Sequence, residues 1–181
     1  MSDATHSQRE SAIELATSSI RFGPGVTLEI GMDLADQGAR RVLVVVDPHL
    51  AKLAPVETAL ESLRDENVSY RLFDRVRVEP TDESFEEAIR FASAEPFDAL
   101  VAIGGGSTID TAKAANLYST YPADLLEYVN QPIGKGRPVP GPLKPLYAIP
   151  TTAGTGSEVG RSSVITLEAT VGTRITSSQS S

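Results

Sequence analysis

Hydrophobic residues follow two patterns along this chain: short continuous apolar runs, and longer stretches in which they recur every three or four positions. The runs, of which 42–46 (VLVVV) is the clearest, are typical of strands buried on both faces of a parallel sheet. The second pattern predicts amphipathic helices. Strands are expected at 18–22, 41–47, 69–76, 99–103 and 146–150. Helices are expected at 26–37, as one or two pieces split near Pro55 within 48–66, at 82–94 with Thr81 as the cap, at 107–118 and at 124–129. Their alternation predicts an α/β fold, Rossmann-like, with a largely parallel sheet and flanking helices.

The patterns divide the chain into three parts. Residues 1–17 are polar and are expected to form a flexible lead-in. Residues 18–166 contain all the expected elements and form one α/β domain. From residue 167 onward the residues are small and polar with no apolar period, so 167–181 is expected to be a disordered tail.

The glycine run after the strand at 99–103 is the most informative feature. Gly104–Gly106 precede a helix, and glycines let a backbone approach a ligand closely while the helix N-terminus attracts anions. This arrangement predicts a site for a nucleotide pyrophosphate. The alternative is a tight strand-to-helix turn closed by a Ser107-x-x-Asp110 capping box.

Asp47 ends the strand at 41–47, and ligands of doubly wound sheets bind at this end of the strands. A carboxylate there can accept hydrogen bonds from ribose hydroxyls and would repel a 2′-phosphate, which favours NAD over NADP. The alternative is that Asp47 caps a following helix, with Pro48 at its first position.

The segment 151–158 (TTAGTGSE) follows the last expected strand and is rich in hydroxyl side chains and glycines. Its hydroxyls and N–H groups could line a second wall of a cofactor cleft. The alternative is an ordinary polar loop.

Composition narrows the chemistry. The chain has no cysteine, which excludes disulfides, thiolate metal sites and a cysteine nucleophile. His6 and His49 are the only histidines, and neither has metal-ligand spacing to other residues. A net charge of −8 argues against nucleic-acid and anionic-membrane partners. The polar N-terminus lacks the apolar core of a signal peptide, so a cytoplasmic location is expected.

Three motifs together resemble the iron-containing (group III) alcohol dehydrogenases: GGGSTIDTAKA (104–114), AIPTTAGTGSE (148–158) and VLVVVD (42–47). The segments at 75–82, 114–118, 132–136 and 142–145 are most similar to the hydroxyacid–oxoacid transhydrogenase branch of that family. Many family members carry Asn where Glu79 stands. The likeness covers roughly 18–166, and we expect it to end near Thr166.

The resemblance implies a fold like the N-terminal domain of dehydroquinate synthase, with NAD as cofactor. It implies that the glycine run and Ser107 hold the pyrophosphate, that Asp47 binds the adenosine ribose, and that the threonines line the adenine and nicotinamide side. Asp110 and Lys113 would brace the loop and helix. The expected cofactor-binding residues are Asp47, Gly104, Gly105, Gly106, Ser107, Thr108, Thr151, Thr152 and Thr155.

The resemblance also implies what this chain lacks. Family members are roughly twice as long, and an all-helical second domain supplies the Asp and His ligands of iron or zinc. We therefore expect neither metal ligands nor catalytic residues here, a truncated chain, and self-association or a missing helical partner. The implied activity is hydride transfer between an alcohol or hydroxy acid, such as 4-hydroxybutyrate, and NAD or a 2-oxo acid. The alternative is an inactive nucleotide-binding or interaction fragment.

Overall fold

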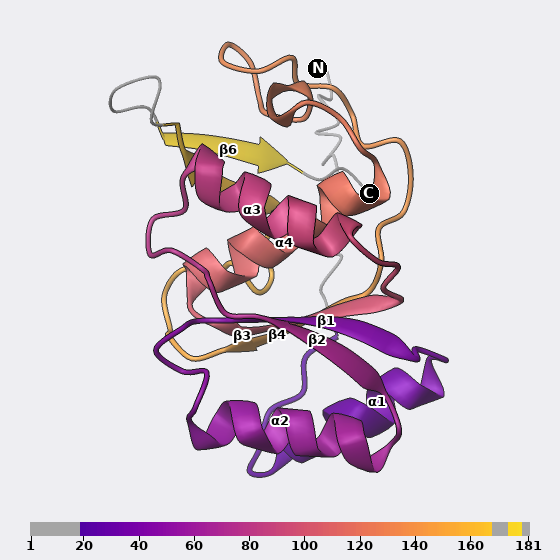
Figure 1. Ribbon diagram of the computed structural model, residues 1–181. Coiled ribbons are helices and arrows are strands. Elements are labelled where there is room, and N and C mark those ends of the chain that lie inside the picture. Colours follow the sequence, from indigo (N-terminus) through magenta and orange to yellow (C-terminus); the bar gives the residue numbers. More distant parts are fainter. Residues whose placement is uncertain (1–18, 168–173, 179–181) are drawn as a thin grey trace, which may run out of the picture.

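The computed structural model describes residues 19–167 and 174–178 (Figure 1). The expected lead-in, with His6, and most of the expected tail lie outside these residues. The central sheet has four parallel strands in the order β2-β1-β3-β4. Their bounds are β1 Arg41–Val46, β2 Ser69–Phe73, β3 Ala99–Gly104 and β4 Leu146–Pro150. The predicted α/β fold with a parallel sheet is therefore confirmed.

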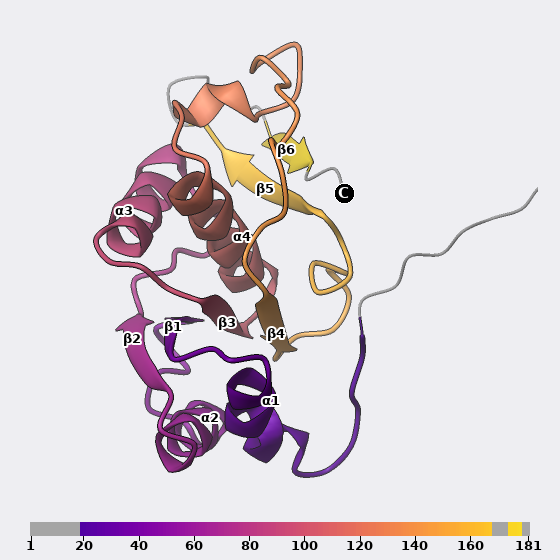
Figure 2. The same ribbon diagram turned by 90° about the vertical axis from the view of Figure 1, so that its right-hand side faces the viewer.

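Helices cover both faces of the sheet (Figure 1). The short η1 (Val26–Glu29), α1 (Ile30–Asp36) and α2 (Ala54–Asp65) lie on one face. On the other face lie α3 (Asp82–Ser93) and α4 (Gly106–Thr120). Figure 2 shows α4 between α3 and β5 (Ser162–Thr166). Strand β5 pairs antiparallel with β6 (Arg174–Ser178). The remaining element is the short η2 (Leu125–Glu127). No helix in the described part of the chain has the length and apolarity needed to cross a membrane.

The side chains of β1 contribute alternately to two hydrophobic cores, because successive strand residues point to opposite faces of the sheet. Val42, Val44 and Val46 pack with α1 and α2 in one core. Leu43 and Val45 pack with residues of α3 and α4 in the other. Burial on both faces explains why this strand is a continuous apolar run in the sequence.

The strand order creates a switch point between β1 and β3. From β1 the chain passes through α2, on one face, to β2. From β2 it crosses to the other side of β1, passing through α3 on the opposite face. Ligands of doubly wound sheets bind in the crevice at such a point, beyond the carboxyl ends of the strands. The fold therefore identifies one edge of the sheet for inspection.

Several boundaries differ from expectation. Residues 19–22, expected within a strand, have no regular structure. Of the one or two helical pieces expected within 48–66, the structure has one, α2, with Pro55 in its first turn, where the missing N–H costs nothing. Strand β2 ends at Phe73 rather than at 76. The cap of α3 by Thr81 is confirmed: its Oγ1 accepts a hydrogen bond from the Ser84 N–H at 3.3 Å.

The end of the chain also differs. Within the range expected to be a disordered tail, Leu167 is buried and Arg174–Ser178 forms strand β6. The reason is long-range: β6 pairs with β5, a partner that local composition does not reveal. The expected division of the chain otherwise stays a prediction.

Helices α1 and α2 meet at Gly31 and Ser62. The Ser62 hydroxyl accepts a hydrogen bond from the Gly31 N–H (2.9 Å) and donates one to the Leu28 carbonyl oxygen (2.6 Å). A Cβ atom on Gly31 would lie 2.0 Å from the Ser62 carbonyl oxygen. Only glycine allows the two helices this close approach.

We expect Gly31→Ala to lower the free energy of unfolding by about 2–3 kcal/mol, because the helices must separate to admit the methyl group. Urea unfolding followed by circular dichroism measures the change. Met32→Ala, at an exposed position of the same helix, is the control and should change stability by less than about 0.5 kcal/mol. Equal stability of Gly31→Ala and the wild type would contradict the packing described here.

Candidate functional site

The carboxyl edge of the sheet brings Asp47 and the glycine run together. Val46 pairs with Ile103, and the Asp47 N–H donates a hydrogen bond to the Ile103 carbonyl oxygen at 3.2 Å. Asp47 therefore follows β1 where Gly104 ends β3. In the sequence the acid precedes the glycines, opposite to the usual dinucleotide-binding order. The pairing of β1 with β3 nevertheless places them side by side at the switch point.

The Asp47 carboxylate has one oxygen engaged locally. Its Oδ1 accepts a hydrogen bond from the His49 N–H at 2.8 Å, and the Asp47 carbonyl oxygen accepts one from the Leu50 N–H at 2.8 Å. These bonds close a turn and not a helix, so the alternative role of Asp47 as a helix cap is wrong. No contact to the other carboxylate oxygen, Oδ2, is found among the described residues. The half-buried side chain can both hold the turn and accept a further hydrogen bond.

The glycine turn is closely packed from behind by Thr108. A Cβ atom on Gly104 would lie 2.3 Å from the Thr108 Oγ1 atom, so no larger residue fits there without a shift. Thr108 is only 1% exposed. Its side chain supports the turn from inside and does not face the edge of the sheet, which differs from the cofactor contact expected for it.

Helix α4 begins at Gly106 with Gly105 as its N-cap, and no side chain caps it. The Thr108 and Ile109 N–H groups donate to the Gly105 carbonyl oxygen at 3.0 and 3.2 Å. The N–H groups of Gly106 and Ser107 have no acceptor within the helix. The alternative of a Ser107–Asp110 capping box is therefore wrong. The turn presents N–H groups at the positive end of a long helix, where an anion is favoured.

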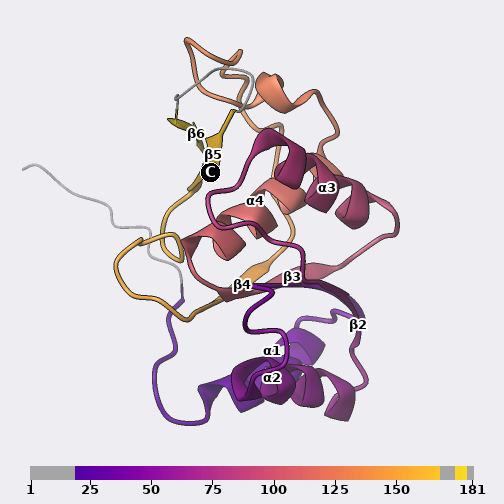
Figure 3. The ribbon, with the colours of Figure 1, turned by 60° about the vertical axis from the view of Figure 1, so that its left-hand side comes forward.

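The segment 151–158 forms the neighbouring wall. The Thr151 N–H donates to the Gly104 carbonyl oxygen at 3.0 Å, which continues the pairing of β3 with β4. Cβ atoms on Gly105 and Gly106 would lie 3.0 Å from the Thr152 Oγ1 and Thr155 Cγ2 atoms. The threonine side chains thus lie directly against the glycines. We call 151–158 the threonine wall and Gly104–Gly106 the glycine turn. Figure 3 shows the threonine wall passing the start of α4.

Two charged residues of α4, Asp110 and Lys113, lie behind this wall and are each 5% exposed. Their charged groups are 3.8 Å apart. Burial raises the pKa of Asp110 and lowers the pKa of Lys113, and the attraction between the two offsets these shifts in part. The resemblance implied a bracing role for this pair, but only the structure shows that its partners lie beyond residue 156. The signal in the sequence is two charges, three positions apart, in a helix of otherwise small and apolar residues.

Glu79, between β2 and α3, has a backbone φ of +58°. This left-handed conformation is better tolerated by Asn than by Glu. It gives a backbone reason for the Asn that many members of the resembled family carry at this position.

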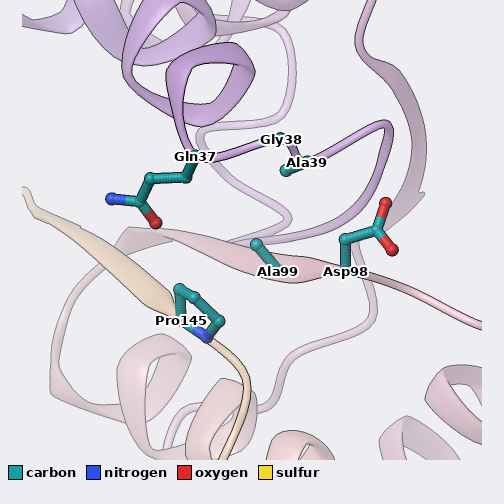
Figure 4. A pocket seen from close by; sticks show the side chains of 6 residues that line it. All are labelled: Gln37, Gly38, Ala39, Asp98, Ala99 and Pro145. Atoms are coloured by element: carbon teal, nitrogen blue, oxygen red, sulfur yellow. The ribbon is translucent and has the colours of Figure 1, made fainter.

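The opposite edge of the sheet has a hollow of about 280 Å³. Its lining residues are Gln37, Gly38, Ala39, Asp98, Ala99 and Pro145 (Figure 4). The Asp98 carboxylate accepts hydrogen bonds from the N–H groups of Arg40 (2.8 Å) and Arg41 (2.9 Å), and these bonds lower the pKa of Asp98. Because this carboxylate holds the starts of β1 and β3 together, we assign the hollow a structural role.

Within residues 19–167 and 174–178, no group of three or more His, Asp or Glu side chains is placed to hold a metal ion. These residues therefore do not fit the metal that the resemblance implies.

The fold and the switch-point edge define a doubly wound α/β domain of the nucleotide-binding type. The family model for iron-containing alcohol dehydrogenases matches residues 17–180. The chain belongs to this family. The match runs past Thr166, so the expectation that the family pattern ends there is wrong.

Similar proteins agree with this assignment. Hydroxyacid-oxoacid transhydrogenase, mitochondrial, from Xenopus tropicalis is 61% identical over 155 residues, covering 85% of this chain and 34% of the relative. The human protein of the same name is 57% identical over 148 residues. Among solved structures, a 1,3-propanediol oxidoreductase has a TM-score of 0.82 at 28% identity, over 93% of this chain and 43% of that chain. An alcohol dehydrogenase from Oenococcus oeni has a TM-score of 0.78 at 31% identity.

The chain spans about a third of the length of these curated relatives. Their names also correct one expectation: the similar transhydrogenases are named as mitochondrial, so the cytoplasmic location inferred from the polar N-terminus is wrong. A compartment is read from a targeting signal and not from the packing of a domain, so the core pattern contains no information about it.

We expect Asp98→Asn to lower the free energy of unfolding at pH 7 by about 1 kcal/mol or less, because a neutral amide accepts the two N–H bonds more weakly and the site is exposed to solvent. The folded-state pKa of Asp98 is lowered, so its contribution is complete above the unfolded-state pKa of about 3.9 and is lost as the pH falls through the folded-state pKa. Urea unfolding at pH 7, 5 and 2.5 measures this.

The difference between the variant and the wild type should be the same at pH 7 and 5 and should shrink at pH 2.5. Asp74→Asn, on an exposed loop, is the matched control and should show little effect at any pH. A deficit in Asp98→Asn that persists unchanged at pH 2.5 would show that the charge is not its cause.

Proposed function

We propose that this chain binds NAD across the carboxyl edge of its sheet, as the cofactor-binding part of an iron-type alcohol dehydrogenase. The observation that carries the proposal is the meeting of Asp47, the glycine turn and the threonine wall at the switch point between β1 and β3. Each part offers the group that a dinucleotide needs: a carboxylate for a ribose, free N–H groups for phosphates, and hydroxyls beside them.

The pyrophosphate is assigned to the turn at Gly104, Gly105 and Gly106 and to the N–H of Ser107. Asp47 Oδ2 is assigned to the adenosine ribose, while Oδ1 keeps its bond to the His49 N–H. Thr151, Thr152 and Thr155 line the adenine and nicotinamide side. Thr108 is assigned a supporting role behind the turn, because it is buried.

The preference for NAD over NADP follows from Asp47. A carboxylate that accepts bonds from both ribose hydroxyls would face the 2′-phosphate of NADP at short range, and two negative charges in that position repel each other. Replacing the carboxylate by a neutral amide removes this repulsion.

When bound, NAD supplies a hydride acceptor and, once reduced, a hydride donor. We propose that the whole protein uses it as the similar transhydrogenases' name suggests: a hydroxy acid such as 4-hydroxybutyrate loses a hydride and a proton, and a 2-oxo acid such as 2-oxoglutarate gains them. This chain's share is to bind and orient the cofactor. The inactive-fragment alternative is not better supported by the comparisons.

The test is calorimetric titration of the 181-residue chain with NAD and with NADP. We expect NAD to bind at least tenfold more tightly than NADP, a difference of about 1.4 kcal/mol. Asp47→Asn, whose amide oxygen can still accept the His49 bond, should weaken NAD binding about tenfold and narrow the difference from NADP.

Asp65→Asn is the control, because it removes one exposed carboxylate at the end of α2, before the start of β2 and so at the opposite edge of the sheet, and it should leave both affinities unchanged. If titration with NAD at millimolar concentration produces no heat of binding, the proposal is overturned. Equal affinities for NAD and NADP in the wild type would overturn the role of Asp47 alone.

A further inference from the structure

Asp110 and Lys113 are the two buried charged residues in the described part of the chain, and the proposed binding of NAD does not use them. They lie on α4, one turn beyond the glycine run, and both side chains are almost completely buried. Burying two charges costs free energy that their mutual attraction only partly returns, and an apolar pair of similar size is often equally stable. Their presence therefore calls for a role other than stability.

The partners of this pair are backbone groups of a single segment, 157–164. The Lys113 Nζ atom donates to the carbonyl oxygens of Ser157 (2.6 Å) and Ser162 (3.0 Å). The Asp110 Oδ2 atom accepts a hydrogen bond from the Val164 N–H at 3.1 Å. The Ser163 hydroxyl also donates to the Asp110 carbonyl oxygen at 3.2 Å. One helix face thus holds the chain where the threonine wall runs into β5.

The threonine wall depends on these anchors. Its first residue is fixed by the sheet, through the bond from the Thr151 N–H to the Gly104 carbonyl oxygen. Apart from the Lys113 bond to Ser157, the hydrogen bonds found for residues 152–160 are local ones, such as those from the Val159 and Gly160 N–H groups to the Gly156 carbonyl oxygen. Gly154 and Gly156 have φ values of +113° and +66°, which only a flexible residue adopts readily. Between its two ends the wall therefore has little to hold its shape.

The position of the wall matters at the level of tenths of an ångström. Cβ atoms on Gly105 and Gly106 would lie 3.0 Å from Thr152 and Thr155 side-chain atoms, so the wall and the turn are already in close contact. A shift of the Ser157 end would change the width of the space in which a dinucleotide must lie. Binding geometry of this kind is normally held by residues outside the ligand contacts.

We propose that Lys113, with Asp110 as its counter-ion and second anchor, is a positioning residue that holds Thr152 and Thr155 against the glycine turn in the geometry that binds the cofactor. This inference rests on the proposed function. It assigns Lys113 an effect on cofactor affinity that is separate from its effect on the stability of the fold.

The separation can be tested with the variants Lys113→Met, Asp110→Asn and the double variant. Lys113→Met leaves the Asp110 charge uncompensated, so its melting temperature should fall. The double variant removes both charges and should regain most of that loss. If Lys113 positions the wall, the double variant should still bind NAD at least tenfold more weakly than the wild type, because the tie to Ser157 is absent.

Hydrogen exchange provides a second readout. Amides of residues 151–162 should exchange faster in the double variant, while those of the central strand at 41–46 should be unchanged. Lys144→Met is the matched control. Lys144 is also partly buried, in the loop before β4, but its Nζ atom contacts Thr120 Oγ1 (3.1 Å) at the far end of α4, so this change should leave NAD affinity within twofold.

The outcomes are distinct. A double variant that regains stability and binds NAD like the wild type would show that the pair is structural only, and would overturn this inference while leaving the proposed function intact. A wild-type chain that does not bind NAD would overturn both. If the double variant does not fold, the single variants decide: both should lose stability, but only Lys113→Met should lose more than about threefold in affinity. Equal losses of affinity in the two would contradict the positioning role.

Discussion

The register between β1 and β3 is the constraint on which both the fold and the candidate site depend. All residues of these strands except Arg41 are buried, so a shift by one residue would turn Leu43 and Val45 toward the wrong core. The register is pinned at both ends. The Asp98 N–H donates to the Arg41 carbonyl oxygen at one end, and the Asp47 N–H donates to the Ile103 carbonyl oxygen at the other. The Asp47 carboxylate and the glycine turn are neighbours because burial of both strands fixes the register of β1 against β3.

Helix α4 connects this register to the threonine wall. It is buried on nearly every side, by the sheet, by α3 and by β5. Small residues such as Ala112 and Ala115 let it pack closely. Because the helix is enclosed, its two charged side chains can form hydrogen bonds only with other buried groups. The backbone of 157–164 provides those groups. The first turn of the helix faces the glycine turn while its second turn anchors the wall, so one rigid element sets the geometry of both.

The local pattern of residues predicts structure correctly where interactions between residues close in the sequence determine it. The apolar run at 42–46 predicted a strand buried on both faces, and Thr81 predicted a helix start, because hydrophobic burial and capping act over a few residues. It misled where the partner is distant. The local spacing of Ser107 and Asp110 fits a capping box, which was the alternative considered, but the Asp110 carboxylate accepts a hydrogen bond from the Val164 N–H, more than fifty residues away. Likewise, strand β6 exists through its pairing with β5, although its composition suggests a tail.

The sequence by itself determined the class of fold, the glycine turn, the carboxylate at the end of a buried strand and the family. All of these depend on residue type and spacing within short segments. Only the tertiary structure decided that Asp47 adjoins the glycine turn, since strand order is set by which hydrophobic faces pair. It also decided that Thr108 lies behind the turn and that Lys113 reaches Ser157. These contacts join segments far apart in the chain, and the packing of the sheet and α4 brings them together.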